Sequence, residues 1–209
     1  MPSPIEFYFD FSSPYGYLAS TRIGALAAKY GRGVSWRPFL LGAVFKVTGS
    51  APLPSLPLKG DYARRDMPRS ARFLGVPFKL PEPFPIATQA PARAVYWVEG
   101  KAPEKLESAV LALYRAYFVD GKDVSNPETA AEALAPLGFD RAEVIAALGE
   151  TGIKERLKSE TQRAIERSVF GSPYVFVDGE PFWGHDRFDQ IGRAHPFAYR
   201  YSARPRRTL

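Results

Sequence analysis

The hydroxyl of Ser13 is the first candidate reactive group of the chain. It lies where a segment that alternates with a period of two is followed by a segment with helical spacing. Ser13 occupies the N-cap position of the expected helix, and Pro14 fits its first turn. Unpaired backbone N–H groups and the positive end of the helix dipole converge at such a position, which favours a small anion or a thiolate. The spacing alone favours the simpler alternative, in which Ser13 only caps its helix.

The absence of cysteine and the small number of histidines limit the reactions that the chain's own side chains can perform. The chain contains no cysteine, which excludes disulfides, a thiolate nucleophile of its own and cysteine metal sites. Its two histidines, His185 and His195, are too few for a zinc site without help from carboxylates. Any thiolate near Ser13 must therefore come from a ligand.

The elements that position Ser13 follow from the periodicity. Residues 5–11 alternate with a period of two, which predicts a strand with a buried face. Helical spacing follows as far as Tyr30, and Gly31 offers a stop. Residues 34–40, VSWRPFL, predict a second strand, and a crossover of this size places the two strands parallel.

The middle of the chain lacks strand patterns and predicts a loop followed by helices. Residues 41–57 are rich in Gly, Pro and Ser and predict a loop that leaves the first subdomain. Residues 60–170 consist mostly of amphipathic segments, several of which begin at capping residues and end at glycine, and they predict an all-helical block. The proline-rich stretch GVPFKLPEPFP interrupts this block once as an extended loop.

Strand patterns return after Gly171. The runs SPYVFV and EPFWG flank Asp178-Gly179, which predicts an antiparallel hairpin, and HDRFDQIGRA predicts a short closing helix. The Ser172-Pro173 bond is a candidate cis peptide that would expose the backbone of Ser172 to a ligand. A trans proline at the start of an edge strand is the alternative.

The predicted order is thus βαβ, a helical insertion and then ββα. This α/β order is that of a thioredoxin-like domain with a large all-helical insertion. We expect residues 1–45 and 168–209 to form a discontinuous thioredoxin-like domain, and residues 46–167 to form the helical insertion domain. In this fold Ser172-Pro173 would face the first helix across the sheet.

The composition, 45% apolar and 24% charged residues, is that of an ordinary globular protein. The net charge of +6 falls to +2 without the four arginines among the last ten residues, and the aromatic residues are not interleaved with basic ones, so we expect no nucleic-acid binding. The C-terminal segment RYSARPRRTL predicts a solvated tail or, alternatively, a lid over an acidic substrate. Without a membrane-spanning run or the features of a signal peptide, we expect a cytoplasmic protein that does not bind membranes.

Three separated motifs resemble the 2-hydroxychromene-2-carboxylate isomerases: FYFDFSSPYGYLA, PLKGDYARRDM and AIERSVFGSPYVFVDGEPFWGHDRFD. That family belongs to the DsbA-like thioredoxin clan and is related to the kappa-class glutathione transferases. The resemblance implies glutathione as cofactor and commonly a homodimer. It also implies an aromatic carboxylate substrate, because the family interconverts 2-hydroxychromene-2-carboxylate and trans-o-hydroxybenzylidenepyruvate in aromatic catabolism.

The resemblance assigns roles near the first strand and after it. Ser13 matches the catalytic serine of the family, at the place where redox relatives carry the first cysteine of a C-x-x-C motif. Lys59 matches a lysine that contacts the glycine end of glutathione. Ser50 falls where relatives usually have asparagine, which weakens one expected hydrogen bond to the cofactor.

The remaining matches lie near the C-terminal end. Ser172, before Pro173, matches the residue whose backbone pairs with the cysteinyl part of glutathione. His185 and Asp186 match the pair at its γ-glutamyl end, where relatives more often carry Asn or Ser in place of His185. An acidic side chain at Asp186 suits the γ-glutamyl ammonium group.

The role implied for Ser13 is to stabilise a thiolate and not to attack. A serine nucleophile needs a neighbouring base, and neither histidine lies in a segment that must approach it. The aromatic carboxylate requires an apolar pocket with a cation. The sequence leaves the choice open among Phe39, Phe45, Tyr96 and Trp97 for the walls, and among Arg37, Lys46 and Arg72 for the cation.

Two alternative functions remain open. A kappa-class-like glutathione transferase would share Ser13, Lys59 and Asp186, but it would consume glutathione by conjugation to an electrophile. A cysteine-free DsbA-like binding module would hold peptides or small ligands in the groove beside Pro173 and show no turnover.

Overall fold

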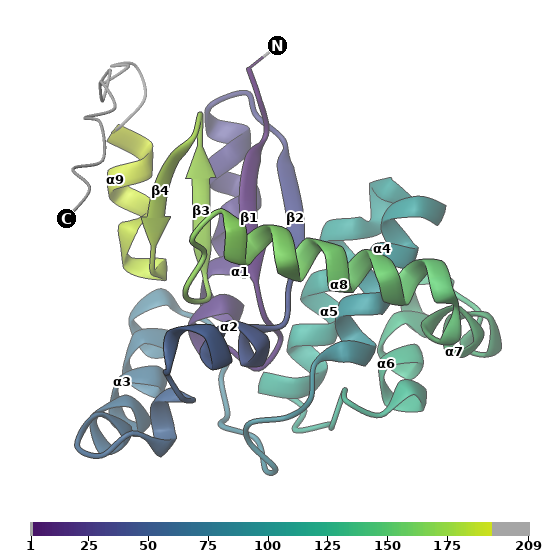
Figure 1. Cartoon of the computed structure of the whole chain (residues 1–209), viewed down its shortest axis with the longest axis horizontal. Coiled ribbons are helices and arrows are strands. Elements are labelled where there is room, and N and C mark those ends of the chain that lie inside the picture. Colours follow the sequence, from purple (N-terminus) through teal and green to yellow (C-terminus); the bar gives the residue numbers. More distant parts are fainter. Residues whose placement is uncertain (1, 194–209) are drawn as a thin grey trace.

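The computed structural model describes residues 2–193, and a four-stranded sheet lies at its centre (Figure 1). The strands have the order β2-β1-β3-β4, and β1 pairs parallel with β2, while β3 runs antiparallel to both of its neighbours. Their bounds are β1 Ile5–Phe9, β2 Val34–Pro38, β3 Tyr174–Val177 and β4 Glu180–Trp183. The arginine-rich segment, residues 200–209, predicted as a tail or lid, lies outside the described residues.

Helices cover both faces of the sheet. Helix α1, Pro14–Lys29, connects β1 to β2 behind the sheet, and α8, Thr151–Glu166, crosses in front of it (Figure 1). The other α-helices of the described chain are α2 Leu41–Thr48, α3 Lys59–Leu74, α4 Gln89–Lys101, α5 Leu106–Phe118, α6 Pro127–Leu134, α7 Arg141–Gly149 and α9 Phe188–Arg193. The short 3-10 turns are η1 Leu53–Ser55, η2 Pro103–Lys105, η3 Ala135–Leu137 and η4 His185–Arg187.

The alternation in β1 divides the core into two faces. Phe7 and Phe9 point toward α1, and the ring of Trp36 on β2 packs edge-on against both. That cluster continues through Tyr114 on α5 into the helical block. Tyr8 points the other way, into a second cluster beneath α8. Two apolar faces therefore hold β1 rigidly, and with it the turn that presents Ser13.

The structure confirms the thioredoxin-like order with its helical block, the hairpin at Asp178-Gly179 and the extended proline-rich stretch. The prediction of a loop over residues 41–57 is wrong at its start, because Leu41–Thr48 form α2. Val44 of this helix is buried against the cluster beneath α8, and Gly49 ends the helix in the left-handed conformation. Tertiary contact thus stabilises a helix too short to show a clear period.

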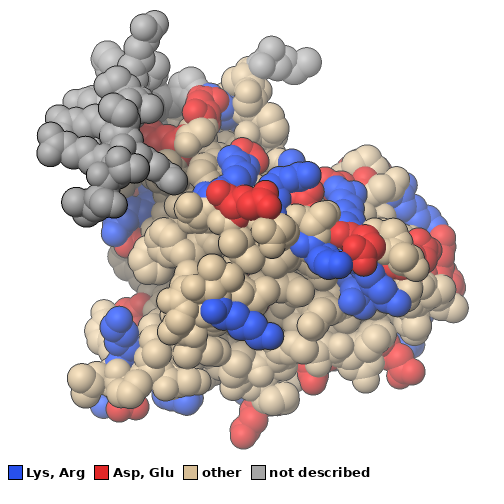
Figure 2. Space-filling model, viewed as in Figure 1, with Lys and Arg blue, Asp and Glu red and all other residues tan. Residues whose placement is uncertain are grey.

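The division into two domains stays a prediction. The core cluster on the α1 face runs without a break from the sheet to α6, and Ala164 on α8 packs against the other face of the sheet. Figure 2 shows acidic and basic side chains interspersed over α8 and the helical block, as expected for a solvated surface. Among residues 2–193, no helix is long and apolar enough to cross a membrane.

Candidate active site

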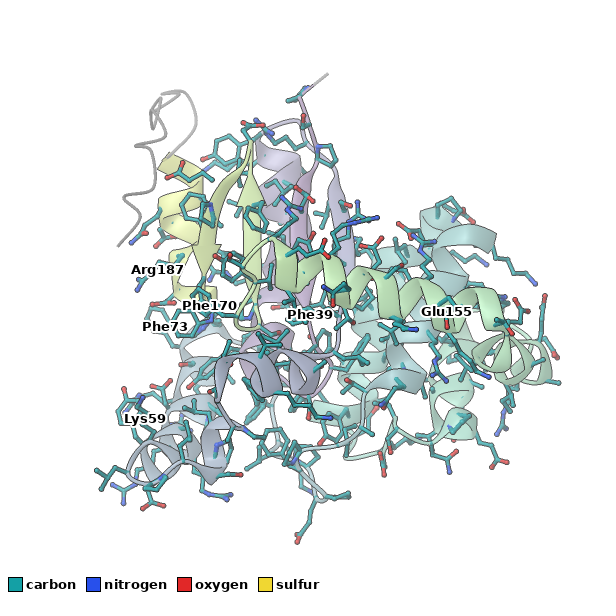
Figure 3. All side chains as sticks on the ribbon, in the orientation of Figure 1. Phe39, Lys59, Phe73, Glu155, Phe170 and Arg187 are labelled. Atoms are coloured by element: carbon teal, nitrogen blue, oxygen red, sulfur yellow. The ribbon has the colours of Figure 1, made fainter. Side chains whose placement is uncertain are left out.

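A cavity of about 1130 Å³ lies where the C-terminal end of β1 meets α2, the start of α3 and the segments that flank β3 and β4. Figure 3 shows Lys59 on α3, with Phe170 and Arg187 on the segments next to β3 and β4. The cavity is lined by all seven residues that the resemblance singled out: Ser13, Ser50, Lys59, Ser172, Pro173, His185 and Asp186. Segments far apart in the chain thus meet at one site, and the roles of these residues stay proposals.

Ser13 stands at the base of the cavity, between β1 and α1. Its backbone is extended (φ −98°, ψ 111°), and its Oγ accepts a hydrogen bond from the amide of Gly16 at 3.0 Å. The predicted N-cap is therefore present. The same hydroxyl donates to the carbonyl oxygen of Ser172 at 2.8 Å, so its proton already points across the site to the segment before β3.

The Ser172-Pro173 bond is cis, and it places both polar groups of Ser172 against α1 and β1. The Oγ of Ser172 accepts from the backbone amide of Asp10 at 3.0 Å. A Cβ at Gly16 would come within 2.7 Å of the Tyr114 hydroxyl and 2.8 Å of the Ser172 Oγ. The close approach of α1 to Ser172 therefore requires glycine at position 16.

Asp10 is a residue at this site that sequence reasoning missed. Its carboxylate is buried and accepts hydrogen bonds from the amides of Ser12 (2.7 Å) and Leu41 (2.9 Å) and from the Thr88 hydroxyl (3.0 Å). Burial raises the pKa of Asp10, and these donors oppose the shift. The sequence feature that could have identified Asp10 is an acidic residue directly after an apolar strand. Asp10 joins the turn before Ser13 to the starts of α2 and α4.

His185 and Asp186 line the cavity from the turn after β4. The His185 ring stacks on Tyr15 of α1, with centroids 5.1 Å apart and planes 13° apart. Burial lowers the pKa of His185, which favours the neutral imidazole, and the charges of Asp186 and Asp66 oppose this shift. The Tyr15 hydroxyl donates to Asp66 on α3 at 2.7 Å, and Asp186 pairs with Arg187 at 3.0 Å.

Ser50 and Lys59 lie on the α2 and α3 side of the cavity. Both are exposed, and Lys59 is the first residue of α3. Gly60 behind it packs against the Pro54 carbonyl so closely that a Cβ would lie 2.5 Å from that oxygen. This contact fixes the start of α3 against η1 and thereby fixes the position of Lys59.

The structure narrows the candidates for a substrate pocket. Phe45 and Lys46 on α2 line the cavity, whereas Phe39, Tyr96, Trp97, Arg37 and Arg72 do not. Phe39 is buried between α2 and α8 (Figure 3), and the Tyr96 hydroxyl donates to the Pro38 carbonyl inside the core.

The other rejected candidates are also engaged elsewhere or turned away. Trp97 packs on Phe139 in the helical block, and Arg37 pairs with the buried Glu160 at 3.6 Å. Arg72 is exposed on α3 outside the cavity lining. Within residues 2–193, no group of three His, Cys, Asp or Glu side chains is placed to hold a metal ion.

A family model and several known proteins are similar to this chain over most of its length. A family model described as a DSBA-like thioredoxin domain matches residues 4–194. A 2-hydroxychromene-2-carboxylate isomerase of Pseudomonas putida is 31% identical over 193 residues, which cover 91% of this chain and 93% of the relative. Glutathione s-transferase kappa 2 of Caenorhabditis elegans is 25% identical over 208 residues, which cover 92% of each chain.

Two solved structures also resemble the structure of this chain. A 2-hydroxychromene-2-carboxylate isomerase structure superposes with a TM-score of 0.82 at 30% identity and covers 91% of this chain and 93% of its own. The cytosolic disulfide reductase DsbM from Pseudomonas aeruginosa, solved with GSH, superposes with a TM-score of 0.64 at 17% identity and covers 91% of this chain and 93% of its own. The second likeness concerns the fold alone.

Proposed function

The chain belongs to the DSBA-like thioredoxin domain family, with 2-hydroxychromene-2-carboxylate isomerases and kappa glutathione transferases among its relatives, and we propose that it is a glutathione-dependent isomerase. The proposed reaction interconverts 2-hydroxychromene-2-carboxylate and trans-o-hydroxybenzylidenepyruvate. One observation carries this proposal: the residues that match the family's cofactor and catalytic positions line one cavity around Ser13.

Features of this cavity fit glutathione as the cofactor. The chain has no thiol of its own, and the Ser172 carbonyl is held beside the N-terminus of α1. A cavity of about 1130 Å³ exceeds the size usual for one drug-sized ligand, so it has room for a tripeptide and an aromatic acid together. When bound, glutathione would supply a thiolate that adds reversibly to the substrate's double bond, which permits rotation about that bond before elimination.

The role proposed for Ser13 is to donate a hydrogen bond to sulfur. Its proton now points to the Ser172 carbonyl, so the hydroxyl must rotate toward a ligand to act. Gly16 N–H can keep donating to the Ser13 Oγ throughout, which polarises the hydroxyl. The helix N-terminus adds a favourable field for a negative charge.

The other matched residues would hold the cofactor and orient it. The Ser172 backbone would pair with the cysteinyl unit, and Lys59 would bind the glycyl carboxylate. Asp186 and His185 would meet the γ-glutamyl end. We also propose a homodimer, in which exposed apolar side chains such as Leu58 (91% exposed) and Phe73 (89%) would be covered, and a cytoplasmic location, where glutathione is abundant.

The experiment that tests the reaction is an ultraviolet progress curve of 2-hydroxychromene-2-carboxylate with purified protein, run with and without glutathione. We expect rapid equilibration that depends on glutathione and leaves its concentration unchanged. Stoichiometric loss of glutathione would support the second candidate, a kappa-type transferase, which the full-length similarity to kappa relatives favours. No acceleration in either case would leave the transferase and the binding-module alternatives, and a direct glutathione titration would then separate those two.

A further inference from the structure

The charged side chains that line the cavity are unevenly compensated. Asp66 accepts from Tyr15 and pairs with Arg69, and Asp186 pairs with Arg187. The basic residues of the lining are Lys46, Lys59 and Arg187. In the part of the chain that the structure describes, neither Lys46 nor Lys59 has an ion-pair partner. Within residues 2–193, Lys46 and Lys59 therefore line the cavity with no carboxylate at ion-pair distance; the third carboxylate of the lining, Asp10, accepts hydrogen bonds from the Ser12 and Leu41 amides.

Lys46 is held on a rigid element. Its helix, α2, is anchored at one end by the hydrogen bond from the Leu41 amide to Asp10, in the same turn that leads to Ser13. Val44 anchors the middle of α2 in the core beneath α8. Phe45 and Lys46 then project to the cavity side. In Figure 2 the surface over α2 is mostly tan, with a basic side chain upon it.

The surroundings of Lys46 suit an aromatic acid. Half-buried Phe45 lies next to it, and the following segment contributes Pro52, Leu53 and Leu56 to the same lining. An ammonium group at the edge of an apolar wall recognises an anion carried on an apolar body. A last-turn lysine is also favoured by the helix dipole, but that role requires neither the cavity nor the apolar wall.

We propose that Lys46 binds the carboxylate of the aromatic substrate, with its ring against Phe45, and that Lys59 serves the cofactor alone. This inference rests on the proposed function for the identity of the two ligands. It makes Lys46 a specificity-determining residue, because a neutral aromatic compound would gain nothing from the ammonium group. The proposal thereby divides the cations of the site into one for the cofactor, on α3, and one for the substrate, on α2.

The test measures binding and not turnover. The probes are 2-hydroxycinnamate and its methyl ester, titrated by the intrinsic tryptophan fluorescence, to which Trp183 in the cavity lining contributes, in the presence and absence of S-methylglutathione. We expect K46Q to bind the acid up to about fivefold more weakly than the native chain, the upper end of the range for an exposed ion pair. The affinity for the ester should stay within about twofold.

Two matched variants support the interpretation. K46R keeps the charge and should retain the preference for the acid. K154Q removes an exposed lysine on α8, outside the cavity lining, and should change neither affinity. The inference is overturned if the native chain shows no preference for the acid, if K46Q loses acid and ester equally, or if K46Q weakens S-methylglutathione instead of the acid.

The outcome is separable from that of the proposed function. An acid preference that K46Q abolishes supports the substrate-cation role even if glutathione-dependent isomerisation is never observed. Conversely, isomerisation by K46Q with an unchanged KM for the carboxylate would refute this role of Lys46 and leave the isomerase proposal intact.

Discussion

Replacement of Ser13 by alanine tests the centre of the proposed mechanism. A charge-assisted hydrogen bond from a hydroxyl contributes about 1.5–3 kcal/mol, and one pKa unit corresponds to about 1.4 kcal/mol. We therefore expect S13A to raise the pKa of bound glutathione by about 1–2 units. The amides and dipole at the start of α1 remain in S13A, so part of the native lowering should persist.

The same substitution also weakens the fold, and this effect must be separated. S13A removes the cap on the Gly16 amide and the bond to the Ser172 carbonyl, which should cost about 1–2 kcal/mol of unfolding free energy. N126A is the matched control, because Asn126 caps α6 through the Glu128 amide far along the chain. It should lower stability without changing the thiol pKa.

The assay is the ultraviolet absorbance of the thiolate, followed as a function of pH at saturating glutathione. Native protein and N126A should share one midpoint, S13A should titrate at higher pH, and S13T, which keeps the hydroxyl, should fall near the native curve. An S13A curve that coincides with the native one, with glutathione still bound, would refute the proposed role of Ser13.

Two further predictions concern the neighbours of Ser13. G16A should lower the free energy of unfolding by about 1–3 kcal/mol in denaturant titrations and weaken glutathione binding, because its Cβ would lie within 3 Å of Tyr114 and Ser172. G100A, whose Cβ meets nothing within 4 Å, should be neutral or stabilising, and equal behaviour of the two would contradict the close contact. Burial lowers the pKa of His185 in the folded chain, so the unfolded chain takes up a proton first as the pH falls below about 6.5, and stability is lost there. H185F keeps a ring on Tyr15 and should lack this loss; parallel curves of unfolding free energy against pH would show that His185 does not cause it.

The local sequence pattern was sufficient to predict the order of strands and helices in the fold. The period of two in β1, the cap at Ser13, the Asp-Gly hairpin and the helical segments between them depend on neighbours in sequence, and the structure contains each of them. The family could be identified for the same reason, since its motifs are short runs of consecutive residues. The absence of cysteine likewise follows from composition alone and means that any thiol at the site must be brought by a ligand.

Contacts between segments that are distant in sequence determined the features that the local pattern did not predict. Helix α2 was missed because a helix of eight residues shows no clear period, and packing of Val44 against Tyr8 and Phe39 stabilises it. Phe45 lines the cavity and Phe39 does not, because Phe39, in the segment between β2 and α2, is buried in the cluster beneath α8.

The site itself is a product of packing. Asp10 gained its place there from partners 31 and 78 residues away, the Leu41 amide and the Thr88 hydroxyl. Ser13 and Ser172 meet across 159 residues of chain. The sequence by itself determined which groups are available, whereas the packing of the sheet against α1, α2 and α3 determined which of them share one cavity, because burial of apolar surface is not encoded in any single segment.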